Sequence, residues 1–129
     1  MKKTLICFCL SATLQSMAQN TTMTPEQVVR QNLDAYNRRD IEGFMASFAD
    51  DIVLYNFADG QKTADGKQQV RKIYQELFDL SPKLHSTIVR RIVFDNKVID
   101  HEHITGRRGN DTLFEIVLVY EVENDKVSV

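Results

Sequence analysis

Cysteine, long apolar runs and an excess of basic charge are all scarce in this chain. Its only two cysteines, Cys7 and Cys9, lie near the N-terminus, and neither follows the small-residue pattern of a lipid-attached cysteine. Because the segment that holds them is predicted to be removed, we expect the mature protein to have no thiol, disulfide or cysteine-bound metal.

The most apolar run near the N-terminus covers residues 5–14, roughly half the length of a membrane-spanning helix. Lys2 and Lys3 precede it, and Ser16-Met17-Ala18 follows with small residues at both positions that specify cleavage. We therefore expect a signal peptide at 1–18, export to the periplasm or outside the cell, and no membrane span. The alternative for this segment is a buried N-terminal helix.

Basic charge is also in short supply. Without Lys2 and Lys3 the 16 basic residues fall to 14 against 18 acidic ones, a net charge of −4, which disfavours nucleic acid as a partner. No serine lies in a nucleophile-elbow motif. No phosphate-binding or dinucleotide pattern is formed by the glycines Gly60, Gly66, Gly106 and Gly109. Nucleotide-dependent and acyl-enzyme mechanisms are therefore excluded, and no cofactor is predicted.

The rest of the chain has ordinary globular composition, with 43% hydrophobic and 26% charged residues, enough for one core. We expect a flexible N-terminus at 19–24 and a single domain at 25–129. Thr24 precedes a proline and lies three residues before Gln27. This pattern is a capping box, and it predicts a first helix that runs to about Arg38.

Two more helices and one strand are expected before the chain turns to strands. Asp40 is placed to cap a short second helix, and a strand is predicted at 52–57. Asp65 is expected to cap a third helix, which ends near Ser81-Pro82.

A β-hairpin follows. The β-branched runs at 84–94 and 97–106 are joined by Asp95-Asn96, two residues suited to a tight turn. Counting outward from that turn places Arg91 opposite Asp100.

The next connection is a predicted four-residue loop at 107–110, which leads into a strand at 112–122. In that register Glu115 lies opposite Glu102. A last short strand is expected at 126–129.

Alternation along these strands divides the sheet into two faces. One face is predicted to gather ionisable groups among valines, namely His85, Arg91, Asp100, Glu102 and Glu115. The other face is predicted to be more apolar. Because three helices can cover only one side, we expect a homodimer through the uncovered sheet face.

The predicted cluster could carry acid/base chemistry. Ionising both Glu102 and Glu115 side by side would cost free energy, so one of them should have a raised pKa. Arg91 should keep Asp100 ionised. That separation suits general acid/base catalysis. The alternative is that Arg91 and Asp100 form a structural pair and the glutamates lie near a solvated end of the sheet.

Other residues have plainer interpretations. His101 and His103 place two imidazoles on one strand face, but the sequence suggests no third ligand there, so we predict interface or surface histidines and no metal. Tyr36, Phe44 and Tyr55 could line a cavity mouth, although such aromatics are more often plain core.

The order of helices and strands resembles that of the nuclear-transport-factor-2-like superfamily, and its SnoaL-like bacterial branch most of all. The resemblance is carried by the motifs at 36–44 and 48–55, and it covers about 25–129. It implies an α+β cone-shaped barrel of the cystatin-like class, in which three N-terminal helices pack on a curved antiparallel sheet. It also implies a pocket between the helices and the sheet, and dimers through the sheet.

The ketosteroid isomerases of this fold allow a residue-by-residue comparison. Their catalytic tyrosine, base aspartate and oxyanion-hole aspartic acid fall on about Asn32, Asn56 and Val117, so none is kept. Asn32 and Asn56 remain candidate hydrogen-bonding groups in a pocket, together with His85.

We therefore expect a small-molecule pocket for an apolar, carbonyl-bearing ligand. Isomerase- or cyclase-like chemistry without metal would use Glu102 or Glu115 as proton carrier. The alternative is a non-catalytic ligand-binding or assembly module. Nuclear transport conflicts with the export signal.

Overall fold

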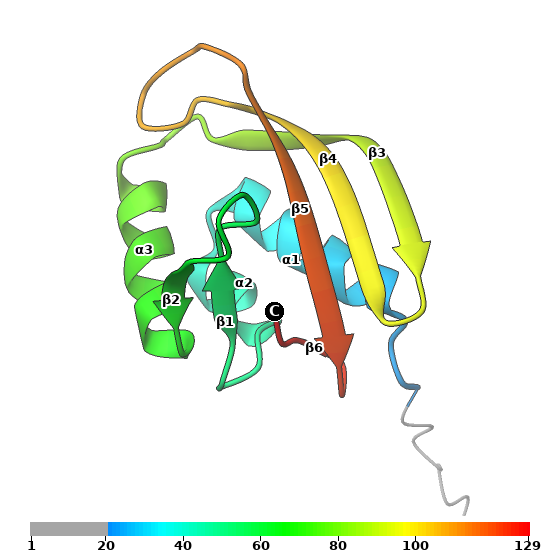
Figure 1. The fold of residues 1–129 in the computed structure, drawn as a ribbon. Coiled ribbons are helices and arrows are strands. Elements are labelled where there is room, and N and C mark those ends of the chain that lie inside the picture. The colour runs from blue at the N-terminus through cyan, green and yellow to red at the C-terminus, as the bar shows by residue number, and fades with distance from the viewer. Residues whose placement is uncertain (1–20) are drawn as a thin grey trace, which may run out of the picture.

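A curved antiparallel sheet lies over three helices (Figure 1). The computed structural model describes residues 21–129, so the predicted signal peptide at 1–18 and the first residues of the predicted flexible segment lie outside it. The elements are α1 (Pro25–Arg38), α2 (Ile41–Ala46), β1 (Val53–Tyr55), β2 (Lys62–Asp65), α3 (Lys67–Asp79), β3 (His85–Phe94), β4 (Lys97–Thr105), β5 (Phe114–Glu123) and β6 (Lys126–Val127). The predicted α+β class is confirmed. Within 21–129, no helix is long and apolar enough to cross a membrane.

The start of α1 matches its predicted capping box. The Gln27 N–H donates to Thr24 Oγ1 at 3.2 Å, and the Thr24 N–H donates to Gln27 Oε1 at 2.8 Å. Asp40 caps α2 as expected by accepting the Gly43 N–H at 3.0 Å. Side-chain caps satisfy N–H groups that a helix leaves unpaired, and they require particular residue types at the helix start. The starts of α1 and α2 could therefore be predicted from the sequence.

The start of α3 differs from the prediction. Asp65 is the last residue of β2, which pairs with β1, and the helix N-cap is Gly66 with φ 87° and no side-chain cap. The Asp65 backbone N–H instead donates to Gln69 Oε1 at 2.9 Å, and its carboxylate pairs with Lys62. Strand pairing of β2, which the sequence analysis did not predict, therefore replaces the expected aspartate cap.

The β3–β4 hairpin has the predicted register near its turn. Asp95 has φ 54°, and Arg91 lies opposite Asp100. A β-bulge at Val89 then shifts the pairing, so that Ile88, not Val89, lies opposite Glu102. Because one extra residue reverses the alternation, His85 is turned to the outer face of the sheet, against prediction.

The predicted β4–β5 register is wrong by one residue. Glu115 pairs with His103 and lies on the outer face, and Glu102 pairs with Ile116. The turn itself is not longer than predicted, because Arg107 bridges Asn110 around Arg108 and Gly109, which both have positive φ. The extra residue lies after this turn, since Ile104 pairs with Phe114. A one-residue slip moves every side chain of a strand to the opposite face.

Gly106 opens this loop, and only glycine fits there. Its φ is 69°, and a Cβ would lie 2.2 Å from the Lys83 carbonyl oxygen. The chain therefore turns away from β4 in close contact with the segment before β3.

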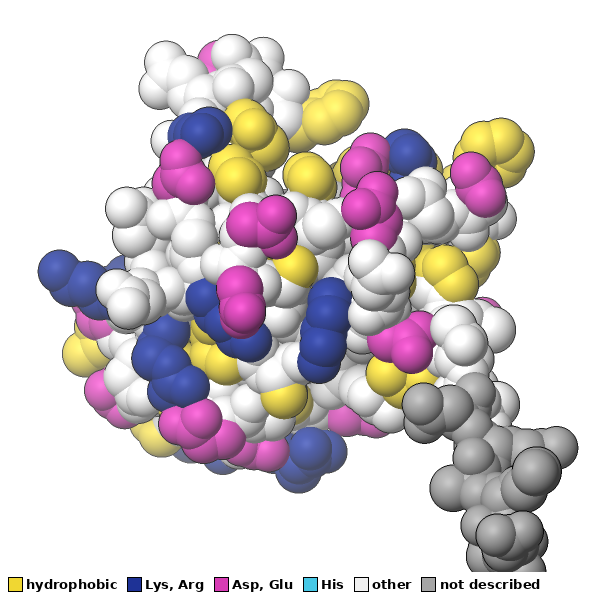
Figure 2. Space-filling view, turned by 90° about the horizontal axis from the view of Figure 1, so that it is seen from below, with side chains coloured by type: hydrophobic (Ala, Val, Ile, Leu, Met, Phe, Trp, Pro, Cys, Tyr) yellow, Lys and Arg dark blue, Asp and Glu magenta, His cyan; other side chains and the backbone are white. Residues whose placement is uncertain are grey.

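The core lies between the helices and the concave face of the sheet. The chain end closes one side of it, since Val127 of β6 is buried and bridges to Phe48 after α2. Viewed from below, acidic and basic side chains are interspersed on the surface, with no continuous basic area on that face (Figure 2).

Candidate functional site

Two acidic side chains of β4 lie buried on the concave face, as the sequence predicted. Asp100 is fully buried and Glu102 is 2% exposed. The two alternate with outward residues on one strand, so both point toward the helices. Arg91 binds Asp100 through both oxygens, with Nε–Oδ1 at 2.7 Å and Nη2–Oδ2 at 2.6 Å. The charge of Asp100 is thus balanced within the sheet.

Ser86 positions the carboxyl group of Glu102, and the Tyr120 hydroxyl also lies close to that group. Its Oε2 accepts the Ser86 hydroxyl at 2.5 Å, whereas its Oε1 is buried and has no hydrogen-bond partner among the residues that the structure describes. Ser86 is itself fixed by Asn37 of α1, which accepts the Ser86 N–H at 2.7 Å and donates to its carbonyl at 2.9 Å. A positioned carboxyl group therefore keeps one oxygen free in the protein interior.

Three tyrosines from three elements lie near enough to Glu102 for its charge to act on their hydroxyls, namely Tyr36 of α1, Tyr74 of α3 and Tyr120 of β5. Burial raises the pKa of each hydroxyl, and the nearby charge of Glu102 raises it further, so all three hydroxyls stay protonated. Neutral hydroxyls can donate hydrogen bonds, and the Tyr120 hydroxyl is the one that lies close to the Glu102 carboxyl group.

The pKa of Glu102 is raised above its usual range. Burial is the largest cause, and the charge of Asp100 adds to it, while Ser86, Arg91 and the Tyr120 hydroxyl act in the opposite direction. The sequence analysis attributed a raised glutamate pKa to repulsion between Glu102 and Glu115. That cause is wrong, because Glu115 lies on the other side of the sheet.

Glu115 belongs instead to an outer cluster with His101 and His103, which we call the histidine cluster. The Nε2 atoms of both histidines face Glu115 Oε1, in close contact for His101 and at 3.7 Å for His103. These contacts lower the pKa of the exposed Glu115 carboxyl group, and the hydrogen bond with His101 is the largest cause. The sequence analysis found no third ligand on this face because its register for β5 was off by one.

Two predicted ligand-binding aromatics form part of a packed aromatic cluster. Phe44 lies 4.5 Å from Tyr74, 5.0 Å from Phe48 and 5.6 Å from Phe78 between ring centroids, and Tyr36 lies 5.5 Å from Phe78. Phe44 is 3% exposed. Its surroundings are those of a core residue. Tyr36 belongs to the same cluster, and the charge of Glu102 is among the causes that raise the pKa of its hydroxyl, after burial and the charge of Tyr74.

The predicted hydrogen-bonding residues are not brought together. Asn32 is buried in α1, where its Nδ2 donates to Ser47 Oγ at 2.7 Å. Asn56 is exposed in the turn after β1, where it accepts the Ala58 N–H at 3.0 Å. Tyr55 is 48% exposed, and His85 lies on the outer sheet face. The structure therefore places none of these four residues beside Glu102.

Ser86 and Tyr120 were missed as neighbours of Glu102. The sequence analysis placed neither on the face of Glu102, because the bulge at Val89 and the extra residue between Asn110 and Phe114 each reverse the alternation of side chains. Ile116, Leu118 and Tyr120 alternate as large apolar residues. A register chosen to bury these residues, and not from the length of the preceding loop, would have placed them on the concave face.

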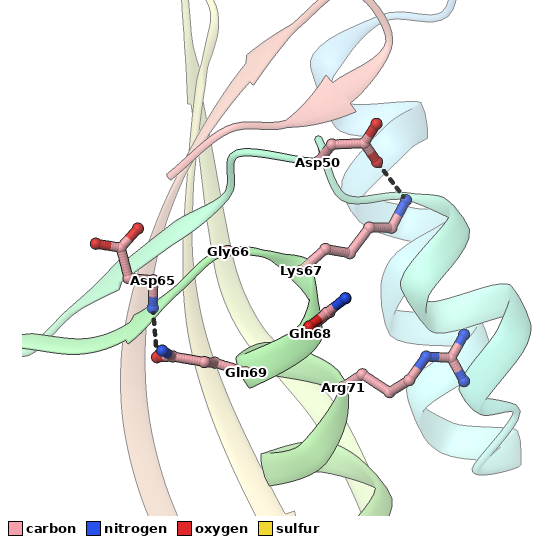
Figure 3. Close-up of a pocket in the computed structure, with 7 residues that line it drawn as sticks. All are labelled: Asp50, Asp65, Gly66, Lys67, Gln68, Gln69 and Arg71. Atoms are coloured by element: carbon pink, nitrogen blue, oxygen red, sulfur yellow. Dashed lines mark hydrogen bonds and ion pairs between the residues drawn. The ribbon is translucent and has the colours of Figure 1, made fainter.

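Two open hollows lie away from Glu102. One, of about 590 Å³, is at the start of α3, where Lys67 pairs with Asp50 and the Asp65 backbone bonds to Gln69 (Figure 3). Arg71 at its edge pairs with Glu42 through both oxygens. The other, of about 320 Å³, is at the β4–β5 loop. Because the cations of the first hollow already have partners, we assign it no ligand.

The sequence matches the SnoaL-like domain family over residues 29–129. A search of curated proteins found no significant match. Among solved structures, the chain is similar to an uncharacterized cystatin-fold protein from Novosphingobium aromaticivorans. The two share 27% identity and a TM-score of 0.73, over 82% of this chain and 94% of that one.

Two more distant structures share the fold. One is a hypothetical protein with a ketosteroid isomerase-like fold from Catenulispora acidiphila in complex with trimethylamine (18% identity, TM-score 0.64, 82% of each chain). The other is an LEH-like epoxide hydrolase from M. tuberculosis (15% identity, TM-score 0.62, 81% of this chain and 77% of that one). Because the family match spans most of the chain and the fold agrees, the protein belongs to the SnoaL-like family and has the nuclear-transport-factor-2-like, cystatin-like fold.

Proposed function

We propose that this SnoaL-like protein binds a small, mostly apolar molecule with a carbonyl group beside Glu102, and that Glu102 exchanges a proton with it. The observation that carries the proposal is the buried Oε1 of Glu102, which has no hydrogen-bond partner among the described residues. Buried polar atoms in native proteins are nearly always satisfied. A ligand group at this oxygen would supply the missing hydrogen bond.

The surroundings of Glu102 suit proton transfer. Its raised pKa favours a neutral carboxyl group that can donate to a carbonyl oxygen and then act as a base. Tyr36, Tyr74 and Tyr120 are protonated donors beside it. The partly buried Ile116 and Tyr120, which pack against the core, offer apolar surface to the rest of the ligand. The expected reaction class is isomerisation or cyclisation, without metal at this carboxyl group.

Solved structures of the same fold support the proposal by analogy. One structure of the same fold holds trimethylamine, and another is an epoxide hydrolase. Both show that the fold can serve small molecules, and neither identifies the ligand of this chain.

The proposal can be tested by native mass spectrometry of purified protein followed by turnover of any captured molecule. We expect a bound small molecule whose conversion slows by about 10²–10⁴-fold in Glu102→Gln, since the amide cannot exchange the proton. Glu115→Gln is the matched control, because it removes a glutamate from the opposite face. Equal conversion by Glu102→Gln and the native protein would exclude the acid/base role.

A second candidate is a non-catalytic assembly module, and the outer sheet face favours it. There Ile92 of β3 is 52% exposed, and Val117 and Val119 of β5 are 61% and 40% exposed. Ile99 of the intervening β4 pairs with both Ile92 and Val119 and connects them into one patch. Adjacent exposed apolar residues of this kind commonly mark an interface. A second copy of the chain, packed sheet to sheet, would bury them. Light scattering should then give twice the monomer mass, whereas a monomer would exclude self-association through this face.

Export remains part of the proposal, on the basis of the segment at 1–18. The mass of the protein recovered from its native compartment should correspond to a chain beginning near Gln19. A full-length chain retained inside the cell would contradict export.

A further inference from the structure

We propose that the histidine cluster on the outer face of the sheet binds a divalent transition-metal ion such as Zn²⁺. His101, His103 and Glu115 each offer one ligand atom, and these atoms all lie within 4.8 Å of one another. The site is separate from Glu102, which points to the opposite face of the same strand.

Strand geometry brings the three ligands together. His101 and His103 alternate with the inward-facing Glu102, so both imidazoles project from the outer side of β4. Glu115 is the direct cross-strand partner of His103 on β5. Because β4 is paired on both sides, by β3 and β5, the backbone that carries the ligands is well fixed.

The side chains already converge on one point. Nε2 of His101 and Nε2 of His103 both face Oε1 of Glu115. The two rings are nearly perpendicular, at 89°, with centroids 5.6 Å apart. Two ligands on a tetrahedral zinc ion lie about 3.3 Å apart, given metal–ligand bonds of about 2.0–2.1 Å. A small rotamer change in the exposed Glu115 side chain can therefore admit the ion between the three atoms.

The ligand chemistry narrows the class of ion. Two imidazole nitrogens and one carboxylate oxygen suit zinc and neighbouring first-row transition metals, and are a poor set for Mg²⁺ or Ca²⁺, which prefer oxygen ligands. The exposed fractions of the side chains are 32% for His101, 37% for His103 and 59% for Glu115. An ion can therefore enter from solvent, and three protein ligands leave a coordination position for water or another ligand.

The test is calorimetric titration of Zn²⁺ into metal-free full chain carrying Cys7→Ser and Cys9→Ser, so that the two thiols cannot bind the metal. We expect one ion per chain and a loss of affinity of at least about tenfold in His101→Ala and in Glu115→Gln. His85→Ala is the matched control, because this third histidine is also on the outer face but outside the cluster. Its affinity should be unchanged.

A thermal readout complements the titration. The same concentration of Zn²⁺ should raise the melting temperature of the starting chain and of His85→Ala equally, and that of His101→Ala by less, because stabilisation by a ligand grows with its affinity for the folded state. Glu115→Gln retains the shape of the side chain, so misfolding cannot imitate its loss of binding. The proposal is overturned if no ion binds, or if His85→Ala loses as much affinity as His101→Ala.

Discussion

Arg91→Ala is expected to lower the free energy of unfolding by about 3–5 kcal/mol, because it leaves the carboxylate of Asp100 buried without a partner. The Arg91 side chain is 13% exposed and that of Asp100 is fully buried, and two hydrogen bonds join them. Glu26 of α1 lies 3.9 Å from the same guanidinium group, so the pair also links the sheet to the helix. Chemical denaturation monitored by circular dichroism measures the loss.

The neighbouring arginine supplies the control for this prediction. Arg90 is exposed on the outer face, so Arg90→Ala should change stability by no more than about 0.5 kcal/mol. Adding Asp100→Asn to Arg91→Ala should recover part of the loss, because it removes the unpaired charge. If Arg91→Ala and Arg90→Ala unfold at the same denaturant concentration, the buried pair does not stabilise the sheet as described.

Phe44→Ala should also cost about 3–5 kcal/mol of stability, since it removes a large ring from a closely packed core. Phe44 lies within 6.0 Å of the ring centroids of Tyr36, Phe48, Tyr74 and Phe78, which the cavity would leave without contacts. Thermal or chemical unfolding of the variant measures the effect.

Phe57 is the matched control, because its ring is 90% exposed and Phe57→Ala should be nearly neutral. The comparison also decides between the two roles considered for Phe44 in the sequence. A loss below about 1 kcal/mol would mean that Phe44 lines an open ligand cavity, and the structural assignment to the core would be wrong.

Features set by local chemistry could be predicted from the sequence. The capping box at Thr24 and the aspartate cap at Asp40 each involve residues three apart, and the Asp95-Asn96 turn fixes its own hairpin. Such short-range signals do not depend on the rest of the fold. They were enough to place Arg91, Asp100 and Glu102 on the concave face.

Features that depend on longer-range packing could not be predicted from the sequence. Nothing local marks the bulge at Val89 or the extra residue between Asn110 and Phe114. Each moved a set of side chains across the sheet, because alternation has a period of two. The predicted site around Glu102 therefore contains Ser86 and Tyr120 in place of Glu115 and His85, and Glu115 lies with His101 and His103 on the outer face.

Glu102 is therefore the residue on which the proposed function depends, and its protonation should affect stability. Because its folded-state pKa is raised, the folded protein binds more protons than the unfolded chain between the two pKa values. Its stabilising contribution is complete below the unfolded-state pKa and is lost as the pH rises through the folded-state pKa. Each tenfold change in the acid constant is equivalent to about 1.4 kcal/mol.

The most direct measurement is an NMR titration of the carboxyl carbons of Glu102 and Glu115 in the same sample. Glu115, exposed beside His101, should titrate below the usual glutamate range, and Glu102, buried with one oxygen unpaired, should titrate above it. Two ordinary values would contradict the account, because Glu102 would then be neither isolated from water nor suited to carry a proton to a bound ligand.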